Sequence, residues 1–240
     1  VIMSDTAATT NNSEETQVTS AIDALLSEND PKEMSFEEFR GAQFDHGLAW
    51  VYFDEGNGGL GVNPVLQRQV EVRLRDAGAS PMKPAMFFMH LAGPTIHTHG
   101  SKESKDRFLR PMFTGEERWC QLFSEPGAGS DLAGLTTRAV KDGDEWVING
   151  HKWFTSGANR AAFTTVFAIT EPDAEKHNKF SSIIVPTDTP GYDIARVVPT
   201  MGHTGGNHCE VNYSDVRVPY ENLLGCLLYT SPSPRDGLLS

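Results

Sequence analysis

The chain has 240 residues and a formal net charge of −12 at pH 7, which is enough length for one large domain or two ordinary ones. The acidic balance disfavours nucleic acid and anionic membrane surfaces as partners. No stretch approaches the roughly 20 apolar residues that a membrane-spanning helix needs, so no membrane span is expected. The cysteines are Cys120, Cys209 and Cys226, without a Cys-x-x-Cys pair. Their spacing argues against a disulfide framework and a zinc site and fits a reducing, cytoplasmic compartment.

The first part of the chain divides into a polar leader and a helical region. Residues 1–18 are rich in Thr, Ser, Asn and Glu, which predicts a disordered leader. Residues 19–116 follow a helical period and predict an α-helical N-terminal domain. Ser35 with Glu38 three positions on is a capping-box arrangement. A last helix of this region is expected to end near Gly115.

The pattern changes near residue 117, and short β-type runs then alternate with turns as far as residue 225. Asp142-Gly143 and Asn149-Gly150 favour the positive φ angles of tight hairpins. About seven strands without helical periods between them predict an antiparallel β-barrel or sandwich over 117–225. The expected fold class is therefore α+β, an all-α N-terminal domain followed by a β middle domain.

Residues 226–240 fit neither pattern, because they show no strand alternation and no helical face. They resemble translated sequencing-adapter DNA more than protein. We expect a tail without function there, the alternative being a genuine divergent C-terminus.

The segment Phe123–Asp131 reads Phe-Ser-Glu-Pro-Gly-Ala-Gly-Ser-Asp, a strand that runs into a glycine-rich turn. Gly127 and Gly129 permit backbone geometry closed to other residues and the close approach of a ligand. Successive N–H groups in such a turn can form an anion-binding nest, and Ser124 and Ser130 add hydroxyls. The segment predicts a cradle for a pyrophosphate or a polar ring edge, the alternative being an ordinary Pro-Gly loop.

A second segment, Trp153-Phe-Thr-Ser-Gly157, is expected on a strand. Trp153 offers a flat face for stacking, and Thr155, two residues on, is expected on the same side of the strand. A flat aromatic face beside a hydroxyl suits a flavin ring. The alternative is a core Trp with a surface Thr.

Together, Trp119–Asp131 and Trp146–Gly157 resemble the middle domain of the acyl-CoA dehydrogenase family. Further matches follow in the family's order, and the resemblance covers roughly residues 35–225. The additional matching segments are Gly100–Pro111, Thr187–Gly191, Met201-Gly202, Val216–Pro219 and Asn222–Gly225.

The resemblance implies FAD as cofactor and assigns residues to it by position. Ser124 stands where many members have Thr, and Gln121 stands where short-chain and medium-chain members often have an aromatic residue, so acyl chain length is not inferred. Ser130 is also implied near the acyl-CoA. The implied FAD-lining residues are Gln121, Phe123, Ser124 and Ser130, and those flanking the isoalloxazine ring are Trp153, Phe154 and Thr155.

The resemblance also implies α,β-desaturation of an acyl-CoA thioester in fatty acid β-oxidation. A glutamate removes the α-proton, hydride leaves the β-carbon for FAD, and electrons pass to an electron-transfer flavoprotein. Family members form homodimers or homotetramers. Their glutamate lies in a C-terminal helical domain that this chain is not expected to contain, so no catalytic residue is assigned, Glu125 is expected to be structural, and the chain alone is expected to be inactive.

Two alternatives share this fold. One is an acyl-CoA oxidase or flavin monooxygenase relative that uses O2, and the other is a non-catalytic module.

Other patterns have simpler explanations. Gly56–Gly61 matches G-x-G-x-x-G, but no second strand follows, so a loop between helices is expected. His90, His97 and His99 could suggest a metal, but His97 and His99 are two apart, which places them on different faces of a helix, and no carboxylate or Cys stands nearby at ligand spacing. No metal site is therefore expected. His203, His208 and Cys209 are expected in a glycine-rich surface loop.

Overall fold

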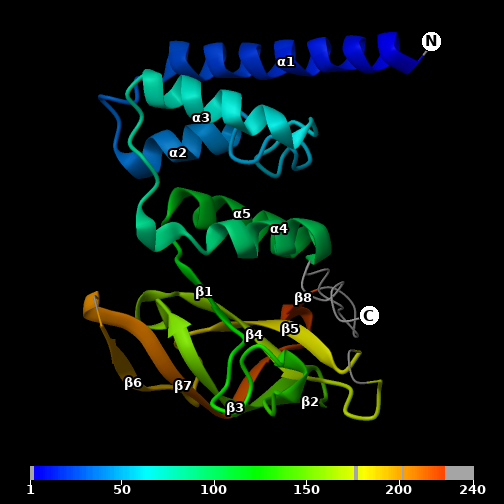
Figure 1. Cartoon of the computed structure of the whole chain (residues 1–240), viewed down its shortest axis with the longest axis vertical. Helices are drawn as coiled ribbons and strands as arrows, with labels where there is room; N and C mark the ends of the chain where they lie inside the picture. The colour runs from blue at the N-terminus through cyan, green and yellow to red at the C-terminus, as the bar shows by residue number, and fades with distance from the viewer. Residues whose placement is uncertain (1–2, 176–177, 202, 225–240) are drawn as a thin grey trace. The chain divides into compact units, whose positions relative to one another are not determined.

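A computed structural model describes residues 3–175, 178–201 and 203–224 (Figure 1). The chain forms two compact units. The first holds the described residues up to Met89 together with Lys102–Glu117, and the second holds His90–Ser101 and the described residues from Arg118 onward. The boundary was expected near residue 116, and the last residue of the first unit is Glu117. The placement of His90–Ser101 in the second unit was not expected. A helical period predicts that a helix has an apolar face, but it does not show which other elements that face will pack against.

The first unit is helical, as expected (Figure 1). Val18, Ile22 and Leu25 are fully buried and pack in one core with Val70 and Leu74. The elements are α1 (Met3–Glu28), α2 (Phe36–Asp45), the 3₁₀ turns Pro64–Leu66 and Pro84–Met86, α3 (Gln67–Asp76) and α5 (Lys102–Thr114).

The expected disordered leader is wrong for residues 3–18, which belong to α1. Buried side chains at Val18, Ile22 and Leu25 anchor this helix to the core. Once an anchored segment is helical, each further residue adds a backbone hydrogen bond, so the helix can extend through polar sequence. The composition of residues 1–18 shows no apolar face and therefore could not indicate this extension.

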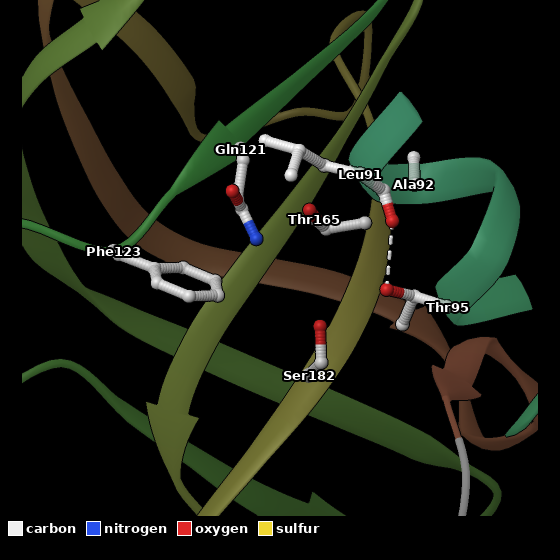
Figure 2. A pocket seen from close by; sticks show the side chains of 7 residues that line it. All are labelled: Leu91, Ala92, Thr95, Gln121, Phe123, Thr165 and Ser182. Atoms are coloured by element: carbon white, nitrogen blue, oxygen red, sulfur yellow. Dashed lines mark hydrogen bonds between the residues drawn. The ribbon is translucent and has the colours of Figure 1, made fainter. Parts of the chain in front are cut away.

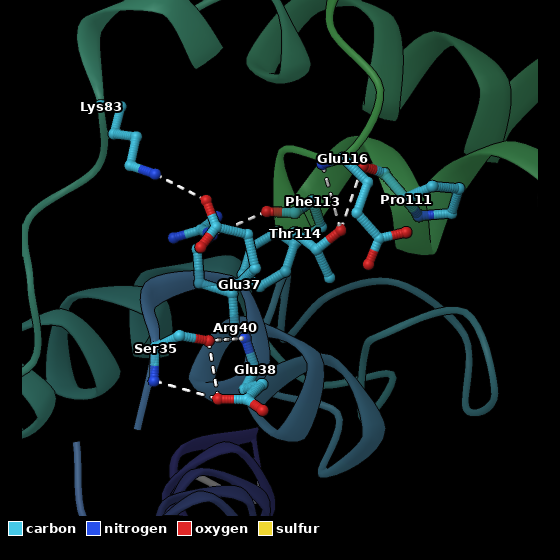
Figure 3. Close-up of polar contacts among 9 residues, drawn as sticks. All are labelled: Ser35, Glu37, Glu38, Arg40, Lys83, Pro111, Phe113, Thr114 and Glu116. Atoms are coloured by element: carbon cyan, nitrogen blue, oxygen red, sulfur yellow. Dashed lines mark hydrogen bonds and ion pairs between the residues drawn. The ribbon is translucent and has the colours of Figure 1, made fainter. Parts of the chain in front are cut away.

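The capping box at the start of α2 is confirmed (Figure 3). The Glu38 N–H donates to Ser35 Oγ at 3.3 Å, and the Ser35 N–H donates to Glu38 Oε2 at 3.1 Å. Two N–H groups at the start of the chain's second helix are thereby satisfied.

Ser35→Ala is expected to lower the free energy of unfolding by about 1 kcal/mol, because it removes the acceptor of the capping box. Ser27→Ala is the matched control: Ser27 is an exposed residue inside α1, where alanine is the better helix former. Urea unfolding followed by circular dichroism measures both. Equal effects of the two changes would show that the cap contributes nothing.

Arg40 of α2 binds the end of α5 (Figure 3). Its Nε donates to the Phe113 carbonyl at 2.6 Å, and its guanidinium lies 3.8 Å from the centre of the Phe113 ring. Burial lowers the pKa of Arg40 to about 10, so the side chain stays charged at neutral pH. The helix ends at Gly115, whose φ of 87° is the left-handed conformation expected there.

The second unit is a mostly antiparallel sheet, as expected, but the sheet is open rather than closed into a barrel. Its described strands follow the order β6-β7-β3-β2-β4-β5-β8, and β1 pairs in parallel with β4. The elements are α4 (Met89–His99), β1 (Trp119–Leu122), β2 (Arg138–Asp142), β3 (Glu145–Ser156), β4 (Phe163–Ile169), β5 (Phe180–Pro186), β6 (Tyr192–Thr200), β7 (His203–Pro219) and β8 (Leu223–Leu224), with 3₁₀ turns at Leu132–Gly134, Ala158–Arg160 and Tyr220–Asn222.

One of the two expected hairpins is confirmed and the other is wrong. Asp142 pairs with Glu145 around Gly143, whose φ is 64°. By contrast, β3 runs straight through Asn149-Gly150. The Asn149 side chain donates to Asp215 Oδ1 and accepts from the Asp215 N–H, both at 2.9 Å. Asn149 therefore stabilises a bulge in the β3–β7 ladder instead of a turn.

The expected surface loop at His203, His208 and Cys209 is also wrong. All three residues belong to β7, and Cys209 is fully buried. The nearby pair Gly205-Gly206 weakens the strand pattern in the sequence, which explains the error.

Candidate functional site

The two predicted cofactor segments meet in the second unit. The Trp153 N–H of β3 donates to the Ser124 carbonyl, which follows β1, at 2.9 Å. The glycine-rich turn and the aromatic segment are therefore in direct backbone contact.

A buried ion pair between Lys152 and Glu125 stabilises this contact. Lys152 is fully buried, and its Nζ donates to the Phe123 carbonyl at 3.1 Å, to the Phe167 carbonyl at 2.7 Å and to Glu125 Oε1 at 2.9 Å. An ammonium has three N–H donors, so all three are used. The residue before Trp153 is thus tied to the residues on either side of Ser124.

Glu125 has the structural role that was expected. Its oxygens also accept from the Thr136 N–H at 2.6 Å, the Thr136 hydroxyl at 2.8 Å and the Thr137 N–H at 2.9 Å. Burial alone would raise the pKa of Glu125, but the Lys152 ammonium and the bonds from Thr136 and Thr137 lower it to about 2. A carboxylate so held is a poor general base.

A bulge alters the expected arrangement of the aromatic segment. Lys152 pairs with Val211 and Thr155 pairs with Cys209, so Trp153 and Phe154 together face one residue of β7. Phe154 has a φ of 54° and is 59% exposed. The two-residue period of a strand is lost at this point. The prediction that Trp153 and Thr155 share a side because they are two residues apart therefore does not hold.

Thr155 is buried, and its hydroxyl donates to the Cys209 carbonyl at 2.7 Å. Its proton is therefore engaged within the sheet. A Phe with positive φ, as at Phe154, is rare. No feature of the sequence predicts this conformation.

Polar residues that the sequence reasoning missed surround Trp153. Arg196 lies 5.3 Å from the centre of the Trp153 ring. Arg196 and His151 both contact Glu210, His151 at 2.7 Å. The Trp153 Nε1 is buried and has no hydrogen-bond partner among the described residues. These groups come from β3, β6 and β7, and only the strand register brings them together.

The glycine-rich turn is more ordinary than expected. Glu125 and Ala128 exchange two backbone hydrogen bonds, at 2.8 and 3.1 Å. Gly127 and Gly129 do not have positive φ angles, which corrects the expectation of unusual backbone geometry. A Cβ atom at either glycine would meet no described atom within 4 Å. The turn is therefore open to an approaching group, and Ser130 is exposed beside it.

A pocket of about 160 Å³ lies between α4 and the strands of the second unit (Figure 2). Of the seven predicted cofactor residues, Gln121 and Phe123 line it, whereas Ser124, Ser130, Trp153, Phe154 and Thr155 do not. The remaining lining residues, which sequence reasoning missed, are Leu91, Ala92, Thr95, Thr165 and Ser182.

Within the described part of the chain, no group of three or more His, Cys, Asp and Glu side chains is arranged to hold a metal ion. Over the same residues, none of the helices has the length and apolar content to cross a membrane.

Comparisons with known proteins agree with this two-part organisation. The acyl-CoA dehydrogenase N-terminal domain profile matches residues 14–116, and the middle domain profile matches residues 120–216. Acyl-CoA dehydrogenase FadE29 of Mycobacterium tuberculosis is 37% identical over 170 residues, which are 70% of this chain and 42% of that protein.

Solved structures give the same result. An acyl-CoA dehydrogenase from Geobacillus kaustophilus has a TM-score of 0.63 at 29% identity, covering 90% of this chain and 58% of that one. The ChsE4-ChsE5 complex from Mycobacterium tuberculosis has a TM-score of 0.63 at 30% identity, covering 92% and 56%.

The helical unit, the sheet and these matches define an α+β fold of the dehydrogenase type. The chain belongs to the acyl-CoA dehydrogenase family, of which it carries the N-terminal and middle domains. It spans about half the length of the curated relatives it matches.

Proposed function

We propose that this chain is part of an FAD-dependent acyl-CoA dehydrogenase that introduces an α,β double bond into an acyl-CoA thioester. The observation that carries the proposal is the hydrogen bond from the Trp153 N–H to the Ser124 carbonyl, which joins the two segments that the family uses for its flavin. Family membership supports the reaction type.

The residues present fit a flavin. Trp153 has a flat ring with an Nε1–H that lacks a partner among the described residues. The turn at Gly127 and Gly129 is open, and Ser130 offers an exposed hydroxyl. Thr155 would have to release the Cys209 carbonyl before its hydroxyl could donate to a ligand. The residues that would hold FAD are Gln121, Phe123, Ser124, Ser130, Trp153, Phe154 and Thr155, with Ser130 also near the acyl-CoA.

Bound FAD would supply the acceptor for the hydride. The described residues would form one wall of its site, orient its ring against Trp153 and keep water from that face. Glu125 does not serve as the base, because its oxygens are filled by hydrogen bonds and its pKa is lowered to about 2. We propose that the base lies outside the described residues and that the chain alone retains FAD weakly and does not turn over.

The proposed partners are an electron-transfer flavoprotein as electron acceptor and further copies of the whole protein in a homodimer or homotetramer. A reducing, cytoplasmic setting is supported by the free, buried thiols of Cys120 and Cys209.

The test uses the enzyme that carries this sequence together with the helical domain that completes the family's flavin site. Trp153→Ala and Ser130→Ala are expected to weaken flavin or acyl-CoA binding by about tenfold, the loss of one stacking or charge-assisted contact. Flavin absorbance on titration measures the flavin affinity. Reduction of the bound flavin by an added acyl-CoA measures the acyl-CoA affinity.

Two controls sharpen this test. Trp153→Phe keeps a flat face and should restore part of the flavin affinity, and Ser214→Ala removes an exposed hydroxyl elsewhere in the same unit. Unchanged absorbance and turnover in Trp153→Ala and Ser130→Ala would refute the site. Turnover with O2 as efficient as with an electron-transfer flavoprotein would point to an oxidase instead.

A further inference from the structure

The pocket beside α4 has one polar wall, built by three neighbouring strands (Figure 2). Gln121 of β1 pairs directly with Thr165 of β4. Ser182 of β5 pairs with Phe167, which is two residues along β4 from Thr165. Residues two apart on a strand face the same way, so Gln121, Thr165 and Ser182 lie on one face of the sheet.

The hydrogen-bonding capacity of this wall is unused within the described part of the protein. Thr165 and Ser182 are each only 5% exposed, and no other described residue hydrogen-bonds either hydroxyl or the Gln121 carboxamide. Thr95, on the opposite wall, differs because its hydroxyl donates to the Leu91 carbonyl at 2.8 Å. These groups face the pocket and have no protein partner among the described residues, so a ligand that hydrogen-bonds to them would gain affinity.

The rest of the lining limits what that ligand can be. The described lining residues include no charged side chain, and Leu91, Ala92 and Phe123 are apolar. A carboxylate or ammonium would lose its hydration here without gaining a counter-charge. A volume of about 160 Å³ is close to that of a cavity of about 150 Å³ that holds one benzene molecule. The fitting group is therefore small and uncharged, and it carries a hydroxyl or carbonyl oxygen.

We propose that this pocket selects acyl groups that carry an uncharged oxygen substituent, with Thr165 and Ser182 as the specificity-determining residues. Gln121, which is also proposed to contact FAD, completes the polar wall between the flavin and the acyl group. The acyl-CoA part of this statement rests on the proposed function. The chemical preference of the pocket itself does not, and it can be measured on the chain alone.

The first experiment titrates the chain with phenol, toluene and benzoate as probes of similar size and follows amide chemical shifts by NMR. The quantity compared is the ratio of phenol affinity to toluene affinity, because the ratio cancels effects on pocket size. In Thr165→Val/Ser182→Ala this ratio is expected to fall at least fivefold, about the value of one hydrogen bond. Benzoate is expected to bind more weakly than phenol.

The control is Thr95→Val, which removes a hydroxyl from the same pocket whose proton is already engaged. Its ratio should change less than twofold. Thr165→Val and Ser182→Ala remove pocket-lining hydroxyls that have no partner among the described residues, so both variants are expected to fold with nearly unchanged thermal stability. An equal ratio in the wild type and the double variant, or benzoate binding as tight as phenol, would overturn the proposal.

A second experiment separates this proposal from the proposed function. In the complete enzyme, kcat/KM is compared for hexanoyl-CoA, 6-hydroxyhexanoyl-CoA and adipoyl-CoA. A preference for the hydroxylated substrate that disappears in the double variant supports the proposal. Turnover of all three with the same preference in both proteins overturns it. Failure to use any acyl-CoA refutes the proposed function, while the probe titration still decides the chemistry of the pocket.

Discussion

Lys152→Met is expected to lower the free energy of unfolding by about 3–5 kcal/mol, which is the usual effect of removing one partner of a buried ion pair. The side chains of Lys152 and Glu125 are 0% and 3% exposed. Without the ammonium, the Glu125 carboxylate is left buried, and the carbonyls of Phe123 and Phe167 lose their donor. Urea unfolding followed by circular dichroism measures the change.

Lys141→Met is the control, because Lys141 is exposed on β2 and its ammonium lies 4.1 Å from the centre of the Tyr220 ring. Its effect should stay within about 1 kcal/mol. The double change Lys152→Met/Glu125→Gln should cost less than the sum of its single changes, because the two residues are coupled. Strict additivity would show that the pair contributes no interaction of its own.

The pH dependence of the same pair has a definite sign. The folded-state pKa of Glu125 is lowered to about 2 from an ordinary value of 4.5. The stabilisation is therefore complete above the ordinary pKa and is lost as pH falls through the folded-state value. In Lys152→Met the carboxyl has no counter-charge and protonates more readily, so the difference from the wild type should narrow as the pH is lowered to about 4.

Local chemistry explains what could be predicted from the sequence. The capping box of Ser35 and Glu38 and the turn at Gly143 depend on residues a few positions apart. The structural role of Glu125 was implied by the family resemblance, and Glu125 is indeed paired with Lys152. The capping box and the turn form wherever the local backbone adopts the expected helix or hairpin, so they do not depend on distant packing.

Register and packing partners explain what could not be predicted. The polar wall of the pocket needs Gln121, Thr165 and Ser182 on adjacent strands, a consequence of strand order that no local pattern contains. The bulge at Phe154 shifts every later residue of β3 to the other face. A sequence reading with an unbroken two-residue period therefore assigns Thr155 to the wrong side.

Gly59→Ala is the other substitution expected to have a large effect, about 3 kcal/mol of unfolding free energy. The segment Gly56–Gly61 forms the expected loop between helices, in which Leu60 and Val62 donate to the Val51 carbonyl and Gly61 donates to the Phe53 carbonyl. A Cβ at Gly59 would lie 2.6 Å from the Trp50 carbonyl oxygen and would overlap the Phe53 carbonyl. These are backbone atoms, which cannot rotate away as a side chain can.

The displacement would reach the core of the first unit. Trp50 and Phe53 are buried, their rings stack at 4.8 Å, and Trp50 also meets Phe113 edge-on at 5.0 Å. Gly56→Ala is the matched control, because a Cβ there has no described atom within 4 Å and the φ of 84° alone causes strain, worth about 1–2 kcal/mol. Thermal unfolding of both variants decides the matter. If Gly59→Ala were no worse than Gly56→Ala, close backbone packing would not be the reason for glycine at this position, and the resemblance of the segment to a dinucleotide-binding loop would need another explanation.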